Sequence, residues 1–322
     1  MEQQAHEYRI EKYTAGKQAE WDCFVDASRN GTFLHKRGYM DYHSNRFADH
    51  SLMFYRNAEL IAILPAHIKA EHFCSHNGLT YGGLLLAYGT TTNEVLYLFD
   101  IAKKYILVNT AATKFIYKPT PHIYHSYPCE EDLYSLFRNG ATVAERKVSS
   151  AIPLGKPLPI SGRRKLTESV KSRLNIIEES NFTTFWNILD ERLQSKYNVT
   201  PVHSIEEITM LKERFPENIR LFCVADNNGN TLGGVVLFIT ECVVHMQYSA
   251  TTEEGRRISA LDHLYEHLIH THFADKRYFD FGISVEDGGH YLNTGLIAYK
   301  ERLGGRAVVY DTYIIDLKQN GR

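Results

Sequence analysis

Three strongly apolar segments in the second half of the chain restrict its fold more than any other feature. They cover residues 219–226, 232–240 and 243–250, and only five residues, which include the turn NNGN, and a two-residue turn separate them. Connections this short join neighbouring antiparallel strands, so the segments predict a β-meander. Helical and strand patterns then alternate, with helices at 260–273 and 293–303 and strands at 278–283 and within 307–317. The second half is therefore predicted to be a mixed α/β domain with a largely antiparallel sheet.

The first half of the chain shows the same kinds of element. Strands are predicted at 7–13, 52–55, 60–67 and 115–117, and helices at 17–28, 93–108 and 130–138, with two more helices after the midpoint at 183–196 and 205–214. The stretch at 152–160 (IPLGKPLPI) is typical of a linker or of a strand that crosses between domains. We therefore expect two tandem domains, 1–155 and 156–322, each with a mixed, largely antiparallel sheet flanked by helices.

The charge and cysteine content exclude several classes of protein. The chain has 36 basic and 38 acidic residues and a formal net charge of −2, whereas a DNA-binding protein usually has a basic excess. The five cysteines are scattered and form no CxxC pair, which is typical of reduced thiols in the cytoplasm. The N-terminus lacks the apolar segment of a signal peptide, and the apolar runs are too short to cross a bilayer. We expect a cytoplasmic protein with no membrane span and no DNA partner.

The loop that follows the meander suits an anionic ligand, because free N–H groups at the start of a helix bind phosphate. With its flanking elements, the loop at 251–260 (TTEEGRRISA) resembles the GCN5-related N-acetyltransferase (GNAT) fold, in which loop amides hold the pyrophosphate of acyl-CoA. Ser259 replaces the middle glycine of the family pattern, and a solvated loop is the alternative for the two arginines. The resemblance implies these residues as contacts of acyl-CoA: Tyr248, Ser249, Ala250, Gly255, Arg256, Arg257, Ser259 and Ala260.

A more specific resemblance comes from the strand YFDFGI at 278–283 and the segment GLIAYKERLGG at 295–305. Both resemble the FemAB-like branch of the GNAT superfamily. This branch includes aminoacyl-tRNA-dependent transferases and CelD-like acetyltransferases with tandem GNAT-like domains. The resemblance implies that the first domain lies on the substrate side, whereas the second binds the acyl donor and carries the catalytic residues.

The helix at 293–303 departs from the GNAT pattern at one catalytic position. GNAT enzymes often place a tyrosine there as general acid for the departing thiolate, but this chain has Lys300, with Tyr299 one residue earlier. The resemblance therefore implies Lys300, Asp280 and Tyr299 as catalytic candidates. A structural ion pair between Lys300 and Asp280 is the alternative. The general base remains open between Asp280, Glu286 and His245. The residues expected to contact the substrate are Tyr81, His245 and Glu286.

One motif suggests a metal, but its surroundings do not support it. His263, Glu266 and His267 match the HxxEH pattern of zinc peptidases. The apolar residues around them are those of a core-packed amphipathic helix, and little chain remains to supply a third ligand. We expect no metal site. The chain also lacks a GxSxG elbow, a P-loop and a GxGxxG motif, which disfavours serine hydrolases, NTPases and dinucleotide-binding enzymes.

Three functions follow from these patterns. The first is an acyl-CoA-dependent N-acyltransferase, in particular an acetyltransferase, that acts on the amine of a small molecule or an amino sugar. The second is a Fem-type aminoacyltransferase that uses charged tRNA, and the third is a non-catalytic GNAT-like binding protein. The near-neutral charge and the lack of long heptad repeats favour acyl-CoA over tRNA. The sequence leaves the oligomeric state open.

Overall fold

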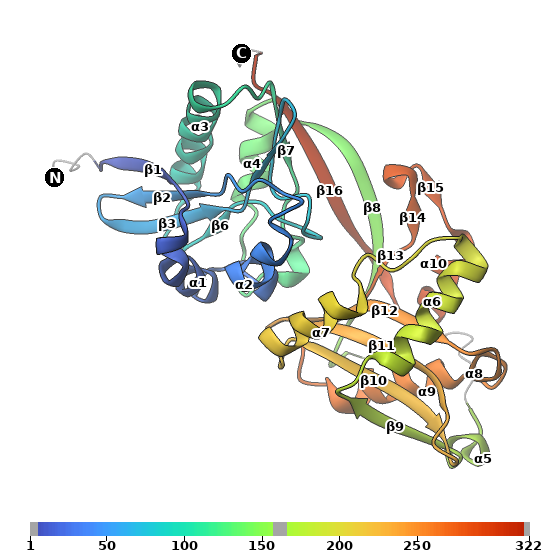
Figure 1. The fold of residues 1–322 in the computed structure, drawn as a ribbon. Helices are drawn as coiled ribbons and strands as arrows, with labels where there is room; N and C mark the ends of the chain where they lie inside the picture. The colour runs from blue at the N-terminus through green and yellow to red at the C-terminus, as the bar shows by residue number, and fades with distance from the viewer. Residues whose placement is uncertain (1–5, 157–165, 319–322) are drawn as a thin grey trace. The chain divides into compact units, whose positions relative to one another are not determined.

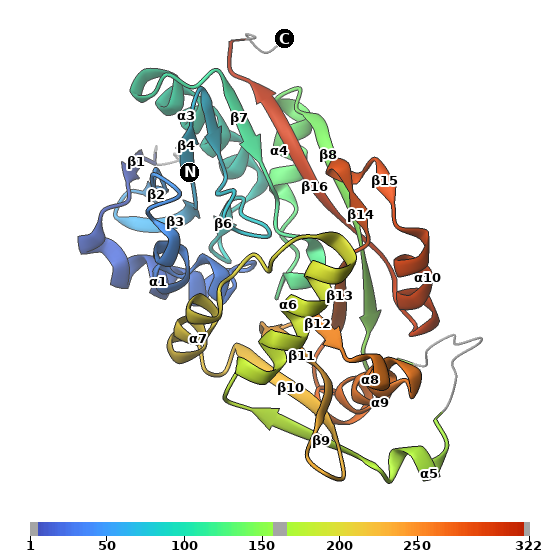
Figure 2. The same ribbon diagram turned by 45° about the vertical axis from the view of Figure 1, so that its right-hand side comes forward.

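The computed structural model describes residues 6–156 and 166–318 and divides into two compact units. Unit 1 comprises Met1–Val148, Val285–Tyr291 and Val309–Arg322, and unit 2 comprises Ser149–Ser284 and Leu292–Val308. Each unit has mostly antiparallel strands flanked by helices (Figures 1 and 2), which confirms the predicted fold class. It remains a prediction that residues 1–155 lie on the substrate side and that residues 156–322 bind the acyl donor and carry the catalytic residues.

Unit 1 contains strands of three sheets and several helices, the longest of which has 18 residues. The elements before the first long helix are β1 (Tyr8–Lys12), η1 (Ala15–Lys17), α1 (Gln18–Ala27), η2 (Phe33–His35), α2 (Arg37–Met40), η3 (Asp41–His43), β2 (Leu52–Arg56), β3 (Glu59–Leu64), β4 (His67–Lys69), β5 (His72–Cys74) and β6 (Leu85–Leu86). The remaining elements are α3 (Thr92–Asn109), β7 (Lys114–Tyr117), η4 (His122–Tyr124), α4 (Glu131–Arg138), β8 (Thr142–Pro153), β14 (Val285–Glu286), η6 (Asp287–Gly289), β15 (Tyr291–Leu292) and β16 (Arg306–Asp316).

The strands of unit 1 form an antiparallel sheet of order β1-β2-β3-β6 and a second sheet of order β4-β5-β7-β16-β8. In the second sheet β5 and β7 run parallel, and α3 lies between them in the chain. A capping box fixes the start of α3, because Thr91 Oγ1 accepts from Glu94 N and Glu94 Oε2 accepts from Thr91 N. Such a cap stabilises a helix by about 1 kcal/mol.

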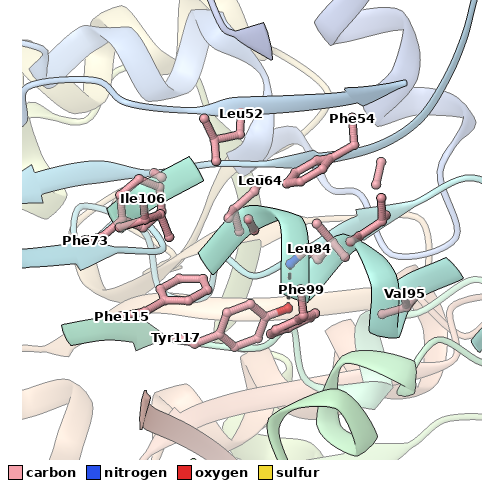
Figure 3. Close-up of a cluster of buried hydrophobic side chains, with 14 of the residues drawn as sticks. Leu52, Phe54, Leu64, Phe73, Leu84, Val95, Phe99, Ile106, Phe115 and Tyr117 are labelled. Atoms are coloured by element: carbon pink, nitrogen blue, oxygen red, sulfur yellow. Dashed lines mark hydrogen bonds between the residues drawn. The ribbon is translucent and has the colours of Figure 1, made fainter. Parts of the chain in front are cut away.

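The core of unit 1 lies between the strands and α3 (Figure 3). Phe115 and Tyr117 of β7 and Phe99 of α3 pack edge to face or tilted in this core. The buried Tyr117 hydroxyl donates to Asp132 Oδ2 at 2.7 Å and accepts from Leu84 N at 2.7 Å. Both polar groups of this apolar region are therefore hydrogen-bonded, which avoids the cost of burying them unpaired.

Unit 2 is built on the predicted meander. Its elements are α5 (Glu168–Lys171), β9 (Leu174–Glu179), α6 (Thr183–Tyr197), α7 (Ile205–Arg214), β10 (Ile219–Asp226), β11 (Thr231–Ile239), β12 (Val243–Thr251), α8 (Glu253–Arg257), α9 (Ala260–His267), the π-helical turn η5 (Leu268–His272), β13 (Tyr278–Ile283) and α10 (Thr294–Arg302). The end of β8 pairs with β13, and the order continues β13-β12-β11-β10-β9. All these pairs are antiparallel except β12 and β13.

Helices pack on both faces of the unit 2 sheet because successive residues of a strand point to opposite sides. At Gly234 of β11 an added Cβ would lie 2.9 Å from the ring of Phe185 on α6. The next residue, Val235, belongs instead to the core formed with Leu264 of α9. The meander, α6 and α9 therefore form three layers in which β11 and β12 are central.

Several sequence predictions need correction. The strand predicted at 60–67 is interrupted at Pro65, which cannot donate to a ladder, so β3 and β4 are separate strands. The helix predicted at 260–273 ends as α at His267 and continues as η5. Residues 142–153 form the long strand β8, which the sequence does not predict because three consecutive charged residues end its first half. The predicted linker at 152–160 therefore begins inside β8, and its residues from 157 onward lie outside the described residues.

In the described part of the chain, no helix combines the length and the apolar character that crossing a membrane requires.

Unit 1 buries an unusual number of histidines. His35, His67 and His76 are each at most 2% exposed, and burial lowers their pKa values to about 3, about 4 and about 2. They are therefore neutral at pH 7. Because the folded pKa lies below the unfolded value, the unfolded chain binds protons first as the pH falls. Their contribution to stability is complete above pH 6.5 and is lost progressively below it.

We expect His76→Asn to flatten the acid side of the stability profile. The free energy of unfolding, measured by urea denaturation, should depend on pH between 5 and 6 less steeply by about 1 kcal/mol per pH unit, since one fewer proton is taken up on unfolding. The exposed His122 provides the control, because His122→Asn should leave the slope unchanged. An unchanged slope in the His76 variant would contradict this account.

Candidate functional site

Strands β12 and β13 separate partway along their length. Their parallel ladder joins Val243 to Tyr278 and ends at the pair His245–Asp280. Beyond this pair β12 continues to Thr251 against β11, while β13 bends at Gly282, which has a φ of 73°. The sheet of unit 2 is therefore open on one side of β12 beyond His245.

A cavity of about 640 Å³ lies along the free part of β12. This volume is within the usual range for small-molecule sites. Its lining comes from α6, β12, α8, α9 and α10 and comprises Arg192, Lys196, Ser249, Thr251, Gly255, Arg256, Ser259, Leu261, Asp262, Tyr265, Asn293, Gly295, Leu296, Tyr299, Arg302 and Leu303.

The charge of this lining favours an anionic ligand. Arg192 and Lys196 of α6, Arg256 of α8 and Arg302 of α10 supply four cationic groups. Asp262 is the single acidic residue of the lining, and its Oδ1 accepts a hydrogen bond from the Tyr299 hydroxyl. Guanidinium and ammonium groups form charge-assisted hydrogen bonds with phosphate oxygens. The excess of positive charge therefore suits a ligand that carries phosphate groups.

The structure of the loop before α9 shows why small residues occupy positions 255 and 259. Gly255 lies against β11, where an added Cβ would be 2.2 Å from the Leu232 carbonyl oxygen. Its N–H donates to Thr252 Oγ1 at 3.0 Å, which caps α8. Ser259 has a φ of 59°, a left-handed conformation that glycine adopts without cost. Position 255 thus requires glycine because the backbone of β11 is close, whereas position 259 has a glycine-like conformation although it holds serine.

The first turn of α9 forms one wall of the cavity. Ser259, Leu261 and Asp262 all line the cavity, and Ala260 begins the helix directly after Ser259. The partial positive charge of a helix N-terminus favours a negative ligand there. The same wall therefore adds a helix dipole to the four cationic side chains.

Two buried tyrosine hydroxyls lie inside the cavity. Tyr265 OH is 2.6 Å from Ser249 Oγ, and Tyr299 OH donates to Asp262 Oδ1 at 2.8 Å. Burial raises the pKa of both phenols well above the ordinary value, and for Tyr299 the nearby Tyr265 and Asp262 add to the shift. Both groups therefore remain protonated near pH 7 and act as hydrogen-bond donors.

Lys300 points to the end of β13, whereas its neighbour Tyr299 lines the cavity. Its side chain is buried, and its Nζ donates to the carbonyl oxygens of Gly282 at 2.8 Å and Ile283 at 2.7 Å. Burial lowers its pKa to about 8, so it is mostly protonated at pH 7. Its ammonium group therefore binds the backbone at the end of β13, and the adjacent Tyr299 is the residue that lines the cavity.

Asp280 and His245 form a buried pair at the point where the strands separate. His245 Nδ1 lies 2.8 Å from Asp280 Oδ2. The other carboxylate oxygen accepts from Ser149 Oγ at 2.5 Å and from Gly282 N at 3.0 Å. A carboxylate at Nδ1 holds an imidazole in the tautomer whose Nε2 carries the lone pair. The pair thus has the arrangement of a base with its positioning residue.

The remaining predicted residues lie outside the cavity lining. Tyr248 packs on Trp186 and its hydroxyl is 2.6 Å from His203 Nδ1, and Ala250 is buried. The alternation of β12 explains this, because Ser249 and Thr251 point to the cavity and their neighbours point away. The guanidinium of Arg257 is 77% exposed and lies 3.9 Å from Glu254.

Two of the predicted substrate residues belong to unit 1. Tyr81 is buried, with its ring 4.5 Å from that of Tyr124 and its hydroxyl 3.4 Å from Thr32 Oγ1. Glu286 is exposed in β14. Neither belongs to the described cavity of unit 2, so their contact with a substrate stays a prediction.

The sequence analysis does not identify Arg192, Lys196, Asp262, Tyr265 or Arg302. A signal exists for two of them, since Arg192 and Lys196 are four residues apart and therefore share one face of α6. Which side of the domain this face points to depends on the packing of α6 against β12, and the sequence does not supply that information.

Among the described residues, no group of three or more His, Cys, Asp and Glu side chains is arranged to hold a metal ion. The histidines of the HxxEH motif lie on α9, and His263 is partly buried.

Comparison with protein families identifies the second half of the chain. Residues 161–301 match the family model described as acetyltransferase (GNAT) domain. A search of curated proteins finds no match. The predicted superfamily is thereby confirmed for this part of the chain.

Solved structures extend the likeness to the whole fold. The crystal structure of FemX superposes with a TM-score of 0.68 at 13% identity, covering 96% of this chain and 97% of FemX. The C-terminal domain of a putative lysylphosphatidylglycerol synthetase from Agrobacterium fabrum gives 0.56 at 10% identity, covering 96% and 93%. A tandem GNAT protein from the clavulanic acid biosynthesis pathway gives 0.50 at 12% identity, covering 98% and 100%. The chain thus has the fold of two tandem GNAT-like units.

The left-handed conformation of Ser259 leads to a stability prediction. Ser259→Gly should raise the free energy of unfolding by about 0.5–1 kcal/mol, because relief of the left-handed strain exceeds the added chain entropy. Chemical denaturation measures the change. Ser172, with a φ of −65°, provides the matched control, since Ser172→Gly should slightly lower stability. Equal effects of the two substitutions would contradict the strain at position 259.

Proposed function

We propose that this protein, whose residues 161–301 match the GNAT acetyltransferase family model, transfers an acyl group from acyl-CoA to an amine of a small molecule or amino sugar. The observation that carries this proposal is the cationic cavity beside the free part of β12. Acyl-CoA carries several phosphate groups. Such a ligand suits a cavity that combines a helix N-terminus with four basic side chains. An acetyl group is our preferred acyl group.

Within this proposal, different walls of the cavity bind different parts of the donor. The first turn of α9 and Arg256 bind the pyrophosphate, and Arg192 and Lys196 of α6 supply further charge for phosphate. Ser249 and Tyr265 lie on the inner side, where their hydroxyls hydrogen-bond to one another. Within the proposal, the donor enters along the free part of β12, and its reactive end lies near the point where β12 and β13 separate.

The proposed chemistry needs one base and one acid. The amine nitrogen attacks the thioester carbonyl, the new C–N bond forms and the C–S bond breaks. His245, positioned by Asp280, accepts the proton of the amine. Tyr299, whose side chain lines the cavity, donates a proton to the departing thiolate. Lys300 acts as a positioning residue that fixes the end of β13.

We also propose a cytoplasmic location. All five cysteines are present as thiols in the structure, and four of them are buried. This agrees with a reducing compartment, where disulfides rarely persist.

A second candidate is aminoacyl transfer of the Fem type, with aminoacyl-tRNA as donor. The likeness to FemX over nearly the whole of both chains favours it. A non-catalytic binding protein is the third candidate, and the serine at position 259 is the departure that favours it. The two transferases differ in the donor that should stabilise the folded protein, acyl-CoA or aminoacyl-tRNA. The non-catalytic protein differs from both because it should bind a ligand without turning over a substrate.

A thermal-shift titration separates the donors. Acetyl-CoA should raise the melting temperature, because a ligand that binds only the folded state stabilises it by mass action. Arg256→Ala should weaken acetyl-CoA binding about tenfold, since it removes a charge-assisted contact to phosphate. The adjacent Arg257→Ala is the matched control, because that side chain lies outside the cavity, and it should bind normally.

The outcomes of this titration assign the donor. A shift with charged tRNA and none with acetyl-CoA or CoA would replace the proposed donor by that of the Fem-type alternative. Binding of acetyl-CoA without turnover of any amine would favour the non-catalytic candidate. Equal losses in the two arginine variants would contradict the proposed position of the phosphates.

The neighbouring residues Tyr299 and Lys300 should respond differently to substitution. Tyr299→Phe should lower kcat about 100-fold or more while leaving the affinity for acetyl-CoA and the melting temperature nearly unchanged, because it removes the proposed acid. Lys300→Met should lower the melting temperature, because two carbonyl oxygens of β13 lose their charged donor. Steady-state kinetics and thermal unfolding check both. The opposite result would be unchanged kinetics in Tyr299→Phe and a large loss of kcat at unchanged stability in Lys300→Met. It would make Lys300 the general acid and leave Tyr299 without a catalytic role.

A further inference from the structure

The second sheet of unit 1 has two faces of opposite character. Phe115 and Tyr117 of β7, Phe73 of β5 and Ile315 of β16 point into the core beneath α3. The residues between them therefore point to the other face, because side chains alternate along a strand. These intervening positions include Cys74, Ile116, Lys118, Thr312 and Ile314.

A hollow of about 650 Å³ occupies this other face. All of its lining residues belong to unit 1 and come from β4, β5, β7, β8, β16 and adjoining turns. Ile116, Ile314 and Ala144 give it an apolar floor, and Thr312 adds a hydroxyl. The volume is far larger than an inorganic ion needs and is typical of sites for small organic molecules.

The charged groups of the hollow are mainly positive. Lys69, Lys118 and Lys147 contribute three ammonium groups, whereas Glu145 is the one acidic residue of the lining. Glu145 Oε2 lies 2.8 Å from Lys147 Nζ and accepts from Thr312 Oγ1 at 3.4 Å. The carboxylate is therefore already shared between a cation and a hydroxyl, and positive charge remains in excess.

Lys118 is a partly buried cation of this hollow. Its Nζ donates to the Leu79 carbonyl oxygen at 2.6 Å. Burial, with a smaller repulsive contribution from Lys147, lowers its pKa to about 8, so it is still mostly charged at pH 7. His67 and His76, which interact electrostatically with it, are neutral at this pH because burial lowers their pKa values. An anion in the hollow would relieve the repulsion between Lys118 and Lys147.

We propose that the hollow on the β5-β7-β16-β8 face of unit 1 is a binding site for a phosphorylated small molecule. Its phosphate group contacts Lys118 and Lys147, and its organic part lies on the apolar floor formed by Ile116 and Ile314. Lysine ammonium groups act as point charges for phosphate, whereas paired recognition of carboxylates usually employs arginine. The site is separate from the cavity of unit 2 and does not depend on the proposed transferase activity.

The test measures binding of two probes, inorganic pyrophosphate and glucose 6-phosphate, to the full chain by isothermal titration calorimetry. The chain carries Arg192→Ala and Arg256→Ala, which remove two of the four cations of the unit 2 cavity and so weaken binding there, while the lysine variants below report on unit 1. Both probes should bind in this background. Lys118→Met and Lys147→Met should each weaken binding about tenfold, as expected for loss of a charge-assisted hydrogen bond. Lys104→Met, an exposed change on α3, is the matched control and should bind normally.

Three results would overturn the proposal: no binding in the arginine background, equal binding by the lysine variants and the control, or succinate binding as tightly as the phosphate probes. If Lys118→Met lowers the melting temperature enough to unfold the chain, a Lys69→Met and Lys147→Met double variant replaces it. The exposed Lys69 and the half-buried Lys147 make this variant compatible with folding. The double variant should then lose at least as much affinity as the single one, and unchanged affinity would refute the site.

Discussion

The buried carboxylate of Asp280 holds three parts of unit 2 in register. One oxygen accepts from Ser149 of β8 and from the Gly282 backbone, and the other faces His245 of β12. A carboxylate without exposure to water is tolerated only when such donors surround it. Because these contacts fix the last rung of the β12–β13 ladder, they also determine where the strands separate. The position of the cavity, and of the residues that line it, follows from that point.

The two units share a plan but use it differently. Each contains one parallel strand pair with a helix between the strands in the chain: β5, α3 and β7 in unit 1, and β12, α9 and β13 in unit 2. In unit 1, the space between α3 and the sheet is filled by Phe99, Phe115 and Tyr117, and only about 10 Å³ remains (Figure 3). Filling by aromatic side chains excludes a donor such as acyl-CoA from this part of unit 1.

Local patterns account for most of the helices and for the meander, because periodicity and capping act within a few residues. The start of α3 at its Thr-Thr-Asn signal and the three strands β10, β11 and β12 are examples. Features that depend on partners far along the chain escape a sequence analysis. Strand β8 is polar in its first half, where none of its residues is buried. The choice of Tyr299 over Lys300 depends on how α10 packs. The sequence therefore points to the loop at 251–260 and to α10, both of which contribute to the cavity lining, but it does not identify the contribution of α6.

The second sheet of unit 1 includes β16, whose residues Tyr313 and Ile315 pair with Tyr117 and Phe115 of β7. The ribosome synthesises β7 long before β16, because the two strands are far apart in the sequence. A ribosome adds residues at about 5–20 per second, so β7 waits on the order of ten seconds for its neighbour. During that time an edge of β7 is left without its permanent partner, and exposed edges of this kind favour pairing with other chains. Unit 1 therefore completes this sheet only after the chain has been synthesised through β16.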